Sequence, residues 1–232
     1  MKIAFLSDIH SNIEAFDAVL KIIEQKNIDR IYIAGDLVGY YYYADEVIDL
    51  CMNRKDIFCI RGNHERNFLS ALSDSSIMEK FTKKYGSSYL RSKEQLSTSQ
   101  ITWLKNLPTK LTAKLDNVTL TIAHGSIHDE DEYVYPDASI ETLINQLSSS
   151  DVTVLGHTHH SFVWSYKNKY LINPGSVGQP RDQSSQASFF VLNTSNMSIV
   201  PFKVNFSCER LKNDISKFDP SYSYLTRVLE RK

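Results

Sequence analysis

The segment KIAFLSDIH, residues 2–10, begins with an apolar run and ends with an aspartate and a histidine. An apolar run as short as Lys2–Ser7 predicts a buried strand. Ser11 and Glu14 then have the spacing of a capping box, which predicts that a helix begins there. The apolar residues of this helix recur at helical intervals, at Ile13, Phe16, Leu20 and Ile23. The sequence therefore predicts that Asp8 and His10 lie between a strand and the helix that follows it.

The pattern of strand and helix continues beyond this first unit. Apolar runs at Arg30–Ala34 and Ile57–Ile60 predict two more strands, with a helix over Ala44–Met52 between them. This alternation is typical of an α/β domain with a parallel sheet. Residues 67–107 are polar with scattered apolar positions and are expected to be helical.

After Pro108 the chain changes to short segments rich in β-branched and aromatic residues, which are typical of strands. The strands predicted there are Lys110–Lys114, Val118–Ala123, Val152–Leu155, Ser161–Tyr166, Tyr170–Ile172, Ser188–Leu192 and Ser198–Val204. A helix is expected over Ile140–Leu147, and helical spacing from Cys208 to Phe218 predicts a C-terminal helical extension over residues 205–232. We expect one domain, residues 1–232, with a parallel half followed by a more antiparallel half.

Composition and charge exclude several classes of protein. With 42% apolar and 23% charged residues, the 232-residue chain is typical of a globular protein and not of a disordered one. A net charge of −1 gives no strong signal for binding nucleic acid. No apolar stretch is long enough for a membrane-spanning helix or a secretory leader. Three cysteines without a Cys-x-x-Cys pair indicate reduced thiols, so we expect a cytoplasmic protein.

Side chains that bind metals follow five of the predicted strands. They are Asp8 and His10, Asp36, Asn63 and His64, His124, and His157 and His159. Ligands of open α/β sheets collect at the carboxyl ends of strands, so we expect these side chains to share one edge. Carboxylate, imidazole and amide oxygen suit divalent first-row metals. Six or more ligands are too many for one tetrahedral zinc and suit two metals about 3.5–4 Å apart.

Two cations so close together need an anion between them, and we expect the carboxylate of Asp36 to bridge them. A water molecule shared by both metals would be acidified and would become the nucleophile. The alternative for each residue alone is ordinary: a lone aspartate after a strand is more often a helix cap or a turn residue. His128 and His160 lie outside this pattern, and we interpret them as ordinary surface or core residues.

The segments around these residues resemble the ordered motifs of the calcineurin-like metallophosphoesterases. The matching segments are Asp8-Ile9-His10, Gly35-Asp36, Gly62-Asn63-His64-Glu65, His124-Gly125 and Gly156-His157-Thr158-His159, in the family's order. Residues 173–182 are similar to the closing loop of the small branch that includes the YfcE-like phosphodiesterases. Residues 35–40 resemble the same branch.

The resemblance implies a four-layer α/β/β/α sandwich of two mixed β-sheets flanked by helices. It implies one metal held by Asp8, His10, Asp36 and His159, and a second held by Asp36, Asn63, His124 and His157. His64 matches the family's catalytic histidine that is not a ligand and that stabilises the transition state or protonates the leaving oxygen. We expect Arg61 and Arg181 to clamp phosphate, because guanidinium groups match phosphate oxygens; loop anchoring is the alternative for both.

Two departures from related motifs narrow the function. Residues 37–40 stand where serine/threonine protein phosphatases have an aspartate and an arginine, so the aspartate that pairs with their catalytic histidine is missing. The second departure is the run of four tyrosines, residues 40–43. Tyr40 and Tyr41 are candidate substrate-binding residues, because such a cluster could stack on a nucleobase or an aromatic leaving group. The alternatives are packing of the loop onto the helix that follows, or contact with a second subunit.

The sequence thus predicts a dinuclear metal-dependent hydrolase of phosphate esters, a phosphodiesterase that acts through a hydroxide bridging the metals. Phosphomonoesterase, protein phosphatase and dinucleoside polyphosphate hydrolase remain alternatives on the same site. A binding module for a nucleotide and an inactive scaffold, like the phosphoesterase-like subunit of the retromer complex, are the alternatives without catalysis. We expect two divalent cations, manganese first, with iron, zinc, nickel or cobalt as alternatives. The expected partner is a phosphate-ester small molecule or nucleotide, with no membrane, and a homo-oligomer is left open.

Overall fold

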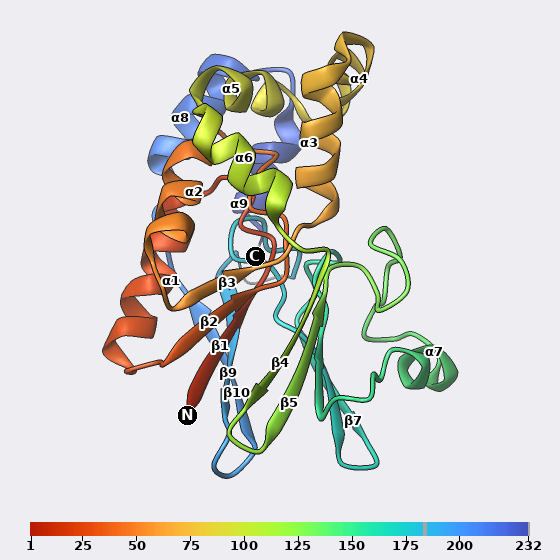
Figure 1. The fold of residues 1–232 in the computed structure, drawn as a ribbon. Coiled ribbons are helices and arrows are strands. Elements are labelled where there is room, and N and C mark those ends of the chain that lie inside the picture. Colours follow the sequence, from red (N-terminus) through yellow and green to blue (C-terminus); the bar gives the residue numbers. More distant parts are fainter. Residues whose placement is uncertain (183–184, 232) are drawn as a thin grey trace.

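Two five-stranded sheets form the centre of the computed structural model, which describes residues 1–182 and 185–231 (Figure 1). The strands are β1 (Lys2–Leu6), β2 (Arg30–Ile33), β3 (Ile57–Cys59), β4 (Lys110–Leu115), β5 (Val118–Ala123), β6 (Val152–Val154), β7 (Phe162–Tyr166), β8 (Lys169–Asn173), β9 (Ala187–Asn193) and β10 (Ser198–Val204). The helices are α1 (Ile13–Gln25), α2 (Ala44–Asn53), α3 (Asn63–Ser73), α4 (Ser75–Tyr85), α5 (Ser88–Gln95), α6 (Thr98–Asn106), α7 (Ile140–Asn145), α8 (Glu209–Phe218) and α9 (Ser223–Leu229). No helix in the described part of the chain is long and apolar enough to span a membrane.

Both sheets are mixed, as the resemblance implied. The first has the order β10-β9-β1-β2-β3, with β1, β2 and β3 parallel and β9 antiparallel to β1. The second has the order β4-β5-β6-β8-β7, with β5, β6 and β8 parallel and the two edge strands antiparallel. The chain therefore builds part of the first sheet, then the whole second sheet, and returns to the first through β9 and β10.

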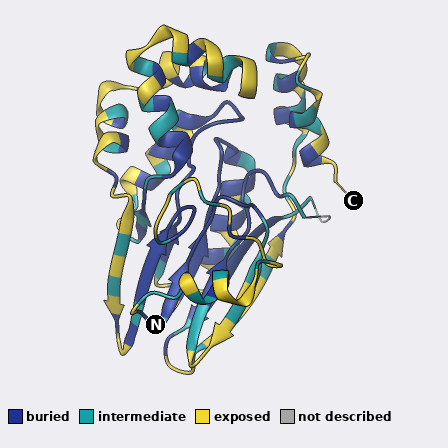
Figure 2. Cartoon of the chain, turned by 90° about the vertical axis from the view of Figure 1, so that its right-hand side faces the viewer, coloured by how far each residue is buried: buried dark blue, intermediate teal, exposed yellow. Residues whose placement is uncertain are grey.

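The alternation of side chains along the strands explains how the layers pack. On β1, Ile3 and Phe5 belong to the apolar core between the two sheets, whereas Ala4 and Leu6 pack in the core with α1 and α2. Because both faces of this strand are covered, its sequence is apolar throughout instead of alternating. The outer face of the second sheet has a smaller apolar cluster that includes Leu143 of α7. Figure 2 shows the buried strands inside and the more exposed helices outside. The four-layer prediction is confirmed.

The predicted elements are present, and most of their bounds differ by one or two residues, but the helical segment predicted from residue 67 begins four residues earlier with α3, and the start of α1 also differs. Asn12, not Ser11, is the N-cap, and its side chain accepts a hydrogen bond from the backbone N–H of Ala15. Ser11 has a positive φ of 56° and its backbone N–H donates to the carbonyl of Leu37. The capping-box prediction is wrong here because a distant loop uses the Ser11 backbone.

The C-terminal helices α8 and α9 pack against the tyrosine run, and Lys232, the last residue of the predicted extension, lies outside the described residues. The hydroxyl of Tyr41 donates to the carbonyl of Leu225, and that of Tyr42 donates to Asp219 over 2.7 Å. The hydroxyl of Tyr43 donates to Asp214. Tyr41 is fully buried, so it cannot contact a substrate in this structure. Tyr41 therefore packs against the C-terminal helix α9, which neither alternative named, and the prediction that it binds substrate is corrected.

Candidate metal centre

Loops at the carboxyl ends of β1, β2, β3, β5 and β6 bring the predicted ligands to one edge of the two sheets. Within the first sheet, the backbone N–H of His10 donates to the carbonyl of Asp36 over 2.9 Å. Between the sheets, the backbone N–H of His157 donates to Oδ2 of Asp8 over 3.0 Å. Hydrogen bonds from backbone N–H groups, to a carbonyl in one case and to a side-chain carboxylate in the other, therefore hold these loops at fixed positions relative to one another, although two of them are about 150 residues apart in the sequence.

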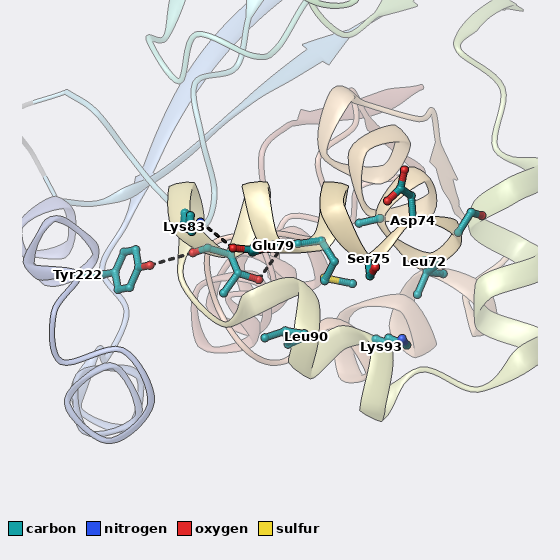
Figure 3. A pocket seen from close by; sticks show the side chains of 12 residues that line it. Leu72, Asp74, Ser75, Glu79, Lys83, Leu90, Lys93 and Tyr222 are labelled. Carbon is teal, nitrogen blue, oxygen red and sulfur yellow. Dashed lines mark hydrogen bonds and ion pairs between the residues drawn. The ribbon is translucent and has the colours of Figure 1, made fainter.

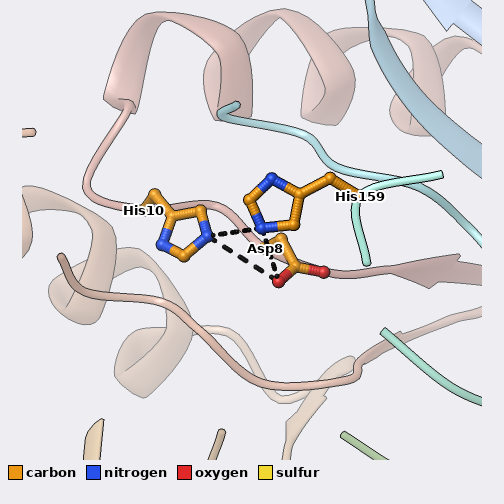
Figure 4. Close-up of side chains that lie close together, drawn as sticks. All are labelled: Asp8, His10 and His159. Carbon is orange, nitrogen blue, oxygen red and sulfur yellow. Dashed lines mark hydrogen bonds and ion pairs between the residues drawn. The ribbon is translucent and has the colours of Figure 1, made fainter. Parts of the chain in front are cut away.

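The first group of converging side chains is Asp8, His10 and His159 (Figure 4). The Nε2 atoms of the two histidines lie 3.0 Å apart, and Oδ1 of Asp8 lies 3.2 Å from Nε2 of His159. Each histidine turns its Nδ1 to a backbone carbonyl, His10 to Val38 over 3.1 Å and His159 to Gln179 over 2.7 Å. A histidine held this way presents the lone pair of Nε2, as metal ligands do. Three acceptor atoms thus face one another, which a cation between them would stabilise.

The second group is Asp36, His124 and His157, with Asn63 beside it. Oδ1 of Asn63 lies 2.9 Å from Nε2 of His124, and Oδ2 of Asp36 lies 3.2 Å from the same atom. Nδ1 of His124 bonds to the carbonyl of Ala34 over 2.7 Å, so its Nε2 is also turned toward oxygen acceptors. Nε2 of His157 is buried and has no hydrogen-bond partner among the described residues. The donor set of this group fits a divalent first-row cation.

Asp36 belongs to the second group and also lies near His10 of the first, so that His10, Asp36 and His64 form a third set of possible ligands. Its Oδ2 lies 3.2 Å from Nε2 of His124 and 3.8 Å from Nε2 of His10. Its Oδ1 accepts a hydrogen bond of 2.8 Å from the backbone N–H of His64, which fixes the orientation of the carboxylate. One carboxylate oxygen therefore faces the histidines of both groups.

The electrostatics of the cluster favour positive charge between these side chains. Burial raises the pKa of the Asp8 carboxyl, but His159 and His124 outweigh it and lower that pKa to about 2. Burial lowers the pKa of His124, but the carboxylate of Asp36 outweighs it and raises that pKa to about 10. Burial and His124 lower the pKa of His157 to about 4, so its imidazole is neutral near pH 7. Anionic carboxylates and neutral imidazoles are the protonation states that bind metal cations, so a cation bound here would displace the proton that His124 otherwise holds.

Five of the predicted ligands have backbone conformations that residues with a side chain rarely adopt. Positive φ angles occur at Asp8, His10, Asp36, His157 and His159, at 56°, 52°, 56°, 67° and 61°. Such strain is found mainly at functional sites, where the surrounding structure enforces it.

Gly62 lets the loop after β3 approach the loop after β2. A Cβ atom on Gly62 would lie 2.3 Å from Oδ1 of Asp36, so only glycine fits there. Glu65, one turn into α3, is fully buried and joins the same two loops. Its carboxylate accepts hydrogen bonds from the backbone N–H groups of Gly62, Asp36 and Val38 over 2.8 to 3.0 Å. Sequence reasoning assigned no role to Glu65, although its capping spacing from Gly62 is a local signal.

His64 lies beside the cluster and not between the two groups. Its ring packs against His10 and Tyr40, with centroid distances of 4.8 and 4.9 Å. Its Nδ1 lies 2.9 Å from the hydroxyl of Tyr89, and that hydroxyl donates to the backbone carbonyl of His64 over 3.1 Å. Nδ1 therefore carries the hydrogen and donates it to the phenol oxygen, which leaves Nε2 available. Tyr89 lies on α5, in a segment whose polar sequence gave no signal for a site.

We predict that Tyr89→Phe lowers kcat about tenfold, which corresponds to the loss of one hydrogen bond of ~1.4 kcal/mol, with KM and metal content unchanged. The reason is that the phenol positions the His64 ring without touching the predicted ligands. Steady-state kinetics with a phosphodiester checks this. Tyr42→Phe is the matched control, because Tyr42 is an equally buried tyrosine whose hydroxyl bonds to Asp219 instead. An unchanged kcat in Tyr89→Phe would contradict the positioning role.

The remaining predicted substrate contacts differ in how they relate to the cluster. Nη2 of Arg181 lies 3.3 Å from the hydroxyl of Tyr40 and 3.4 Å from Oε1 of Gln179, and the Tyr40 ring is 4.7 Å from that of His10. Tyr40 and Arg181 thus border the cluster. Arg61 follows β3, where its backbone N–H donates to Pro108 and its Nε is buried without a partner. These contacts do not join Arg61 to the cluster, so its role as a clamp stays a prediction.

A separate groove of 630 Å³ lies along α4 and α5 (Figure 3). Leu72, Met78, Leu90 and Tyr222 are among the side chains that line it. The predicted site residues do not line this groove, so it is distinct from the metal centre.

Comparisons with known proteins agree with this geometry. The calcineurin-like phosphoesterase superfamily domain matches residues 1–197. The uncharacterized protein MJ0912 of Methanocaldococcus jannaschii is 30% identical over 234 residues, which cover 93% of this chain and 92% of that protein. A metallophosphoesterase from Sphaerobacter thermophilus is 25% identical, with a TM-score of 0.79 and 98% of both chains covered. YfcE, a phosphoesterase from E. coli, shares the fold at 21% identity, with a TM-score of 0.52 and coverage of 88% of this chain and 100% of YfcE. The chain therefore belongs to the calcineurin-like phosphoesterase superfamily, and it is a metallophosphoesterase, a hydrolase of phosphoric esters.

Proposed function

We propose that this enzyme is a dinuclear metal-dependent phosphodiesterase. The observation that carries the proposal is the convergence of acceptor atoms around Asp36, whose Oδ2 faces Nε2 of His124 at 3.2 Å and Nε2 of His10 at 3.8 Å. Asp8, His10, Asp36 and His159 would hold one cation, and Asp36, Asn63, His124 and His157 would hold the other. When bound, two divalent cations would neutralise the phosphate oxygens and acidify the attacking water.

The chain's own residues supply the other parts of the mechanism. His64, held by Tyr89 at Nδ1, is free at Nε2, and the negative charge of a bound phosphate ester would favour protonation there. The protonated Nε2 would then stabilise the phosphoryl group or donate its proton to the leaving oxygen. Arg181 lies at the border of the cluster, where its guanidinium group would donate paired hydrogen bonds to phosphate oxygens. The backbone N–H of His64 keeps the Asp36 carboxylate oriented throughout. We propose that one domain, residues 1–232, carries all these groups.

The partner of His64 argues against the protein phosphatase alternative. The pairing aspartate of the serine/threonine protein phosphatases is absent from residues 37–40, and the neutral phenol of Tyr89 occupies that hydrogen-bonding position on the ring. A carboxylate would stabilise a protonated histidine more strongly than a phenol does. Manganese as the native metal and a cytoplasmic location remain predictions from the sequence.

A substrate panel tests the proposal. Chelator-treated protein should not hydrolyse bis(p-nitrophenyl) phosphate, and Mn²⁺ should restore turnover, with Fe²⁺, Zn²⁺, Ni²⁺ and Co²⁺ compared at equal concentration. The diester should exceed p-nitrophenyl phosphate in kcat/KM by about tenfold, which is a difference of ~1.4 kcal/mol in transition-state binding. A higher kcat/KM for the monoester would favour the phosphomonoesterase alternative. No turnover with any of these metals would favour the scaffold.

A further inference from the structure

Two tyrosines that the sequence interpretation did not single out lie exposed beside the metal centre. Tyr133 and Tyr135, in the segment between β5 and α7, are 51% and 39% exposed. Their rings stack with centroids 5.8 Å apart and an interplanar angle of 11°. The ring of Tyr133 lies 4.0 Å from that of His157, a predicted metal ligand. An exposed stacked pair of large rings is informative, because large aromatic side chains are ordinarily mostly buried.

The loop that carries this tyrosine pair is firmly anchored. Val134, between the two tyrosines, is 1% exposed and packs in the apolar cluster on the outer face of the second sheet. Arg66 of α3 bonds to Glu130 and to Asp131, which ties the loop to the helix that begins with Asn63. Exposed and buried side chains alternate along residues 133–135, so that Val134 is buried and both tyrosine rings lie at the surface. A rigid aromatic surface costs little entropy when a ligand stacks on it.

Aromatic side chains also border the metal centre on the side of His64. The Tyr85 ring is 4.8 Å from that of His64 and 5.1 Å from that of Tyr40. Aromatic rings therefore border the cluster from both sheets.

The charge of the loop indicates which kind of group would lie on the pair. Residues 129–132 are four consecutive acidic residues, and Arg66 is bonded to two of them. A second phosphate near them would be repelled, whereas a neutral ring would not be. This disfavours a polyphosphate chain and favours an uncharged planar substituent on a single phosphate.

We propose that Tyr133 and Tyr135 form a stacking platform for a planar aromatic group carried by the phosphate ester, a nucleobase or an aryl group. The inference rests on the proposed phosphoesterase site, since the phosphate must lie on the predicted ligands while the ring lies on the platform. The sequence suggested that the tyrosine run 40–43 stacks on an aromatic group of the substrate. The proposal assigns this stacking role to Tyr133 and Tyr135, on the other side of the metal centre. Base–aromatic stacking is worth a factor of about five in affinity at its lower end, and a factor of about ten lies within its range.

Calorimetric binding to the Mn²⁺-loaded protein tests the platform without relying on turnover. AMP and ribose 5-phosphate share phosphate and sugar and differ in the base, and phenyl phosphate and methyl phosphate make the same comparison for an aryl group. In the wild type the aromatic member of at least one pair should bind about tenfold more tightly. Tyr135→Ala, which leaves the contact of Tyr133 with His157 in place, should bring that ratio close to one and leave ribose 5-phosphate binding unchanged. Tyr133→Phe should keep the ratio.

Tyr166→Ala is the matched control. Tyr166 is 37% exposed and stacks on Trp164 with an interplanar angle of 9°, but it pairs with Lys169, at the end of β8 opposite to the metal centre. This variant should keep the wild-type ratio. Equal binding within both pairs by the wild type, with Mn²⁺-dependent binding of ribose 5-phosphate retained, would overturn the platform alone. Binding of none of the four compounds, together with no Mn²⁺-dependent hydrolysis, would overturn the proposed function as well.

Discussion

Asp36→Asn should reduce the metal content of the protein from two ions per chain to roughly one or none, and phosphodiester turnover should fall with it. The expected loss is large because this carboxylate is the ligand that the two predicted metal sites share. A substitution at any other predicted ligand removes a ligand atom from only one of the two predicted metal sites. At Asp36, a substitution removes an atom from both.

The geometry shows why asparagine, although nearly the same shape, cannot replace this aspartate. Oδ1 of Asp36 accepts a hydrogen bond from the backbone N–H of His64, so the amide oxygen of an asparagine would take that position. The NH₂ group would then point where Oδ2 now faces His124 and His10. An NH₂ group is a donor and cannot bind a cation. The variant therefore presents the wrong group to both predicted metal sites.

Elemental analysis after loading with Mn²⁺ measures the stoichiometry, and the unfolding temperature with and without Mn²⁺ measures the same binding through stability. The wild type should gain stability from Mn²⁺, and Asp36→Asn should gain little. Asp56→Asn is the matched control, since Asp56 is a surface aspartate paired with Arg54. Circular dichroism establishes that both variants fold. Two ions per chain in folded Asp36→Asn would contradict the bridging role.

The convergence of the predicted ligands at one edge could be predicted from the sequence because its signal is local. Each predicted ligand follows a short apolar run or a glycine, and parallel strands place their carboxyl ends at one edge. The strained conformations at positions such as His157 and His159 could not be predicted this way. Their positive φ angles depend on contacts such as the hydrogen bond from His157 to Asp8, which lies 149 residues away in the sequence.

The neighbours of the site were harder to predict, because their partners are distant in the sequence. The four tyrosines after Gly39 look like an exposed aromatic surface, but α8 and α9 return from the end of the chain and cover Tyr41 and Tyr42. Tyr89 reaches His64 from a helix that has no motif of its own. Composition indicates that aromatic side chains are present, and only the packing of helices on loops decides which of them stay exposed.

His64→Ala should keep both metal ions and lose about 10²- to 10⁴-fold in turnover, the range for removal of a general acid or base. Metal binding should survive because the link from this residue to Asp36 is its backbone N–H, which alanine retains. The lost imidazole is the group that Tyr89 orients through Nδ1. Burial lowers the pKa of His64 to about 4, so the ring is neutral near pH 7 before substrate binds.

The choice of leaving group separates the two roles of His64. If the ring protonates the leaving oxygen, the loss should be larger for an alkyl ester than for a p-nitrophenyl ester, whose leaving oxygen needs no proton. A ring nitrogen of His64 also lies within 4.8 Å of ligand atoms of His10 and Asp36, so a ligand role is the competing explanation. Metal analysis distinguishes a catalytic role from a ligand role, because removal of a ligand would lower the metal content by one ion per chain. His128→Ala, which removes an exposed histidine bonded to Asn145, is the control and should keep both metal and turnover. Near wild-type turnover of an alkyl diester by His64→Ala would show that this histidine is not catalytic.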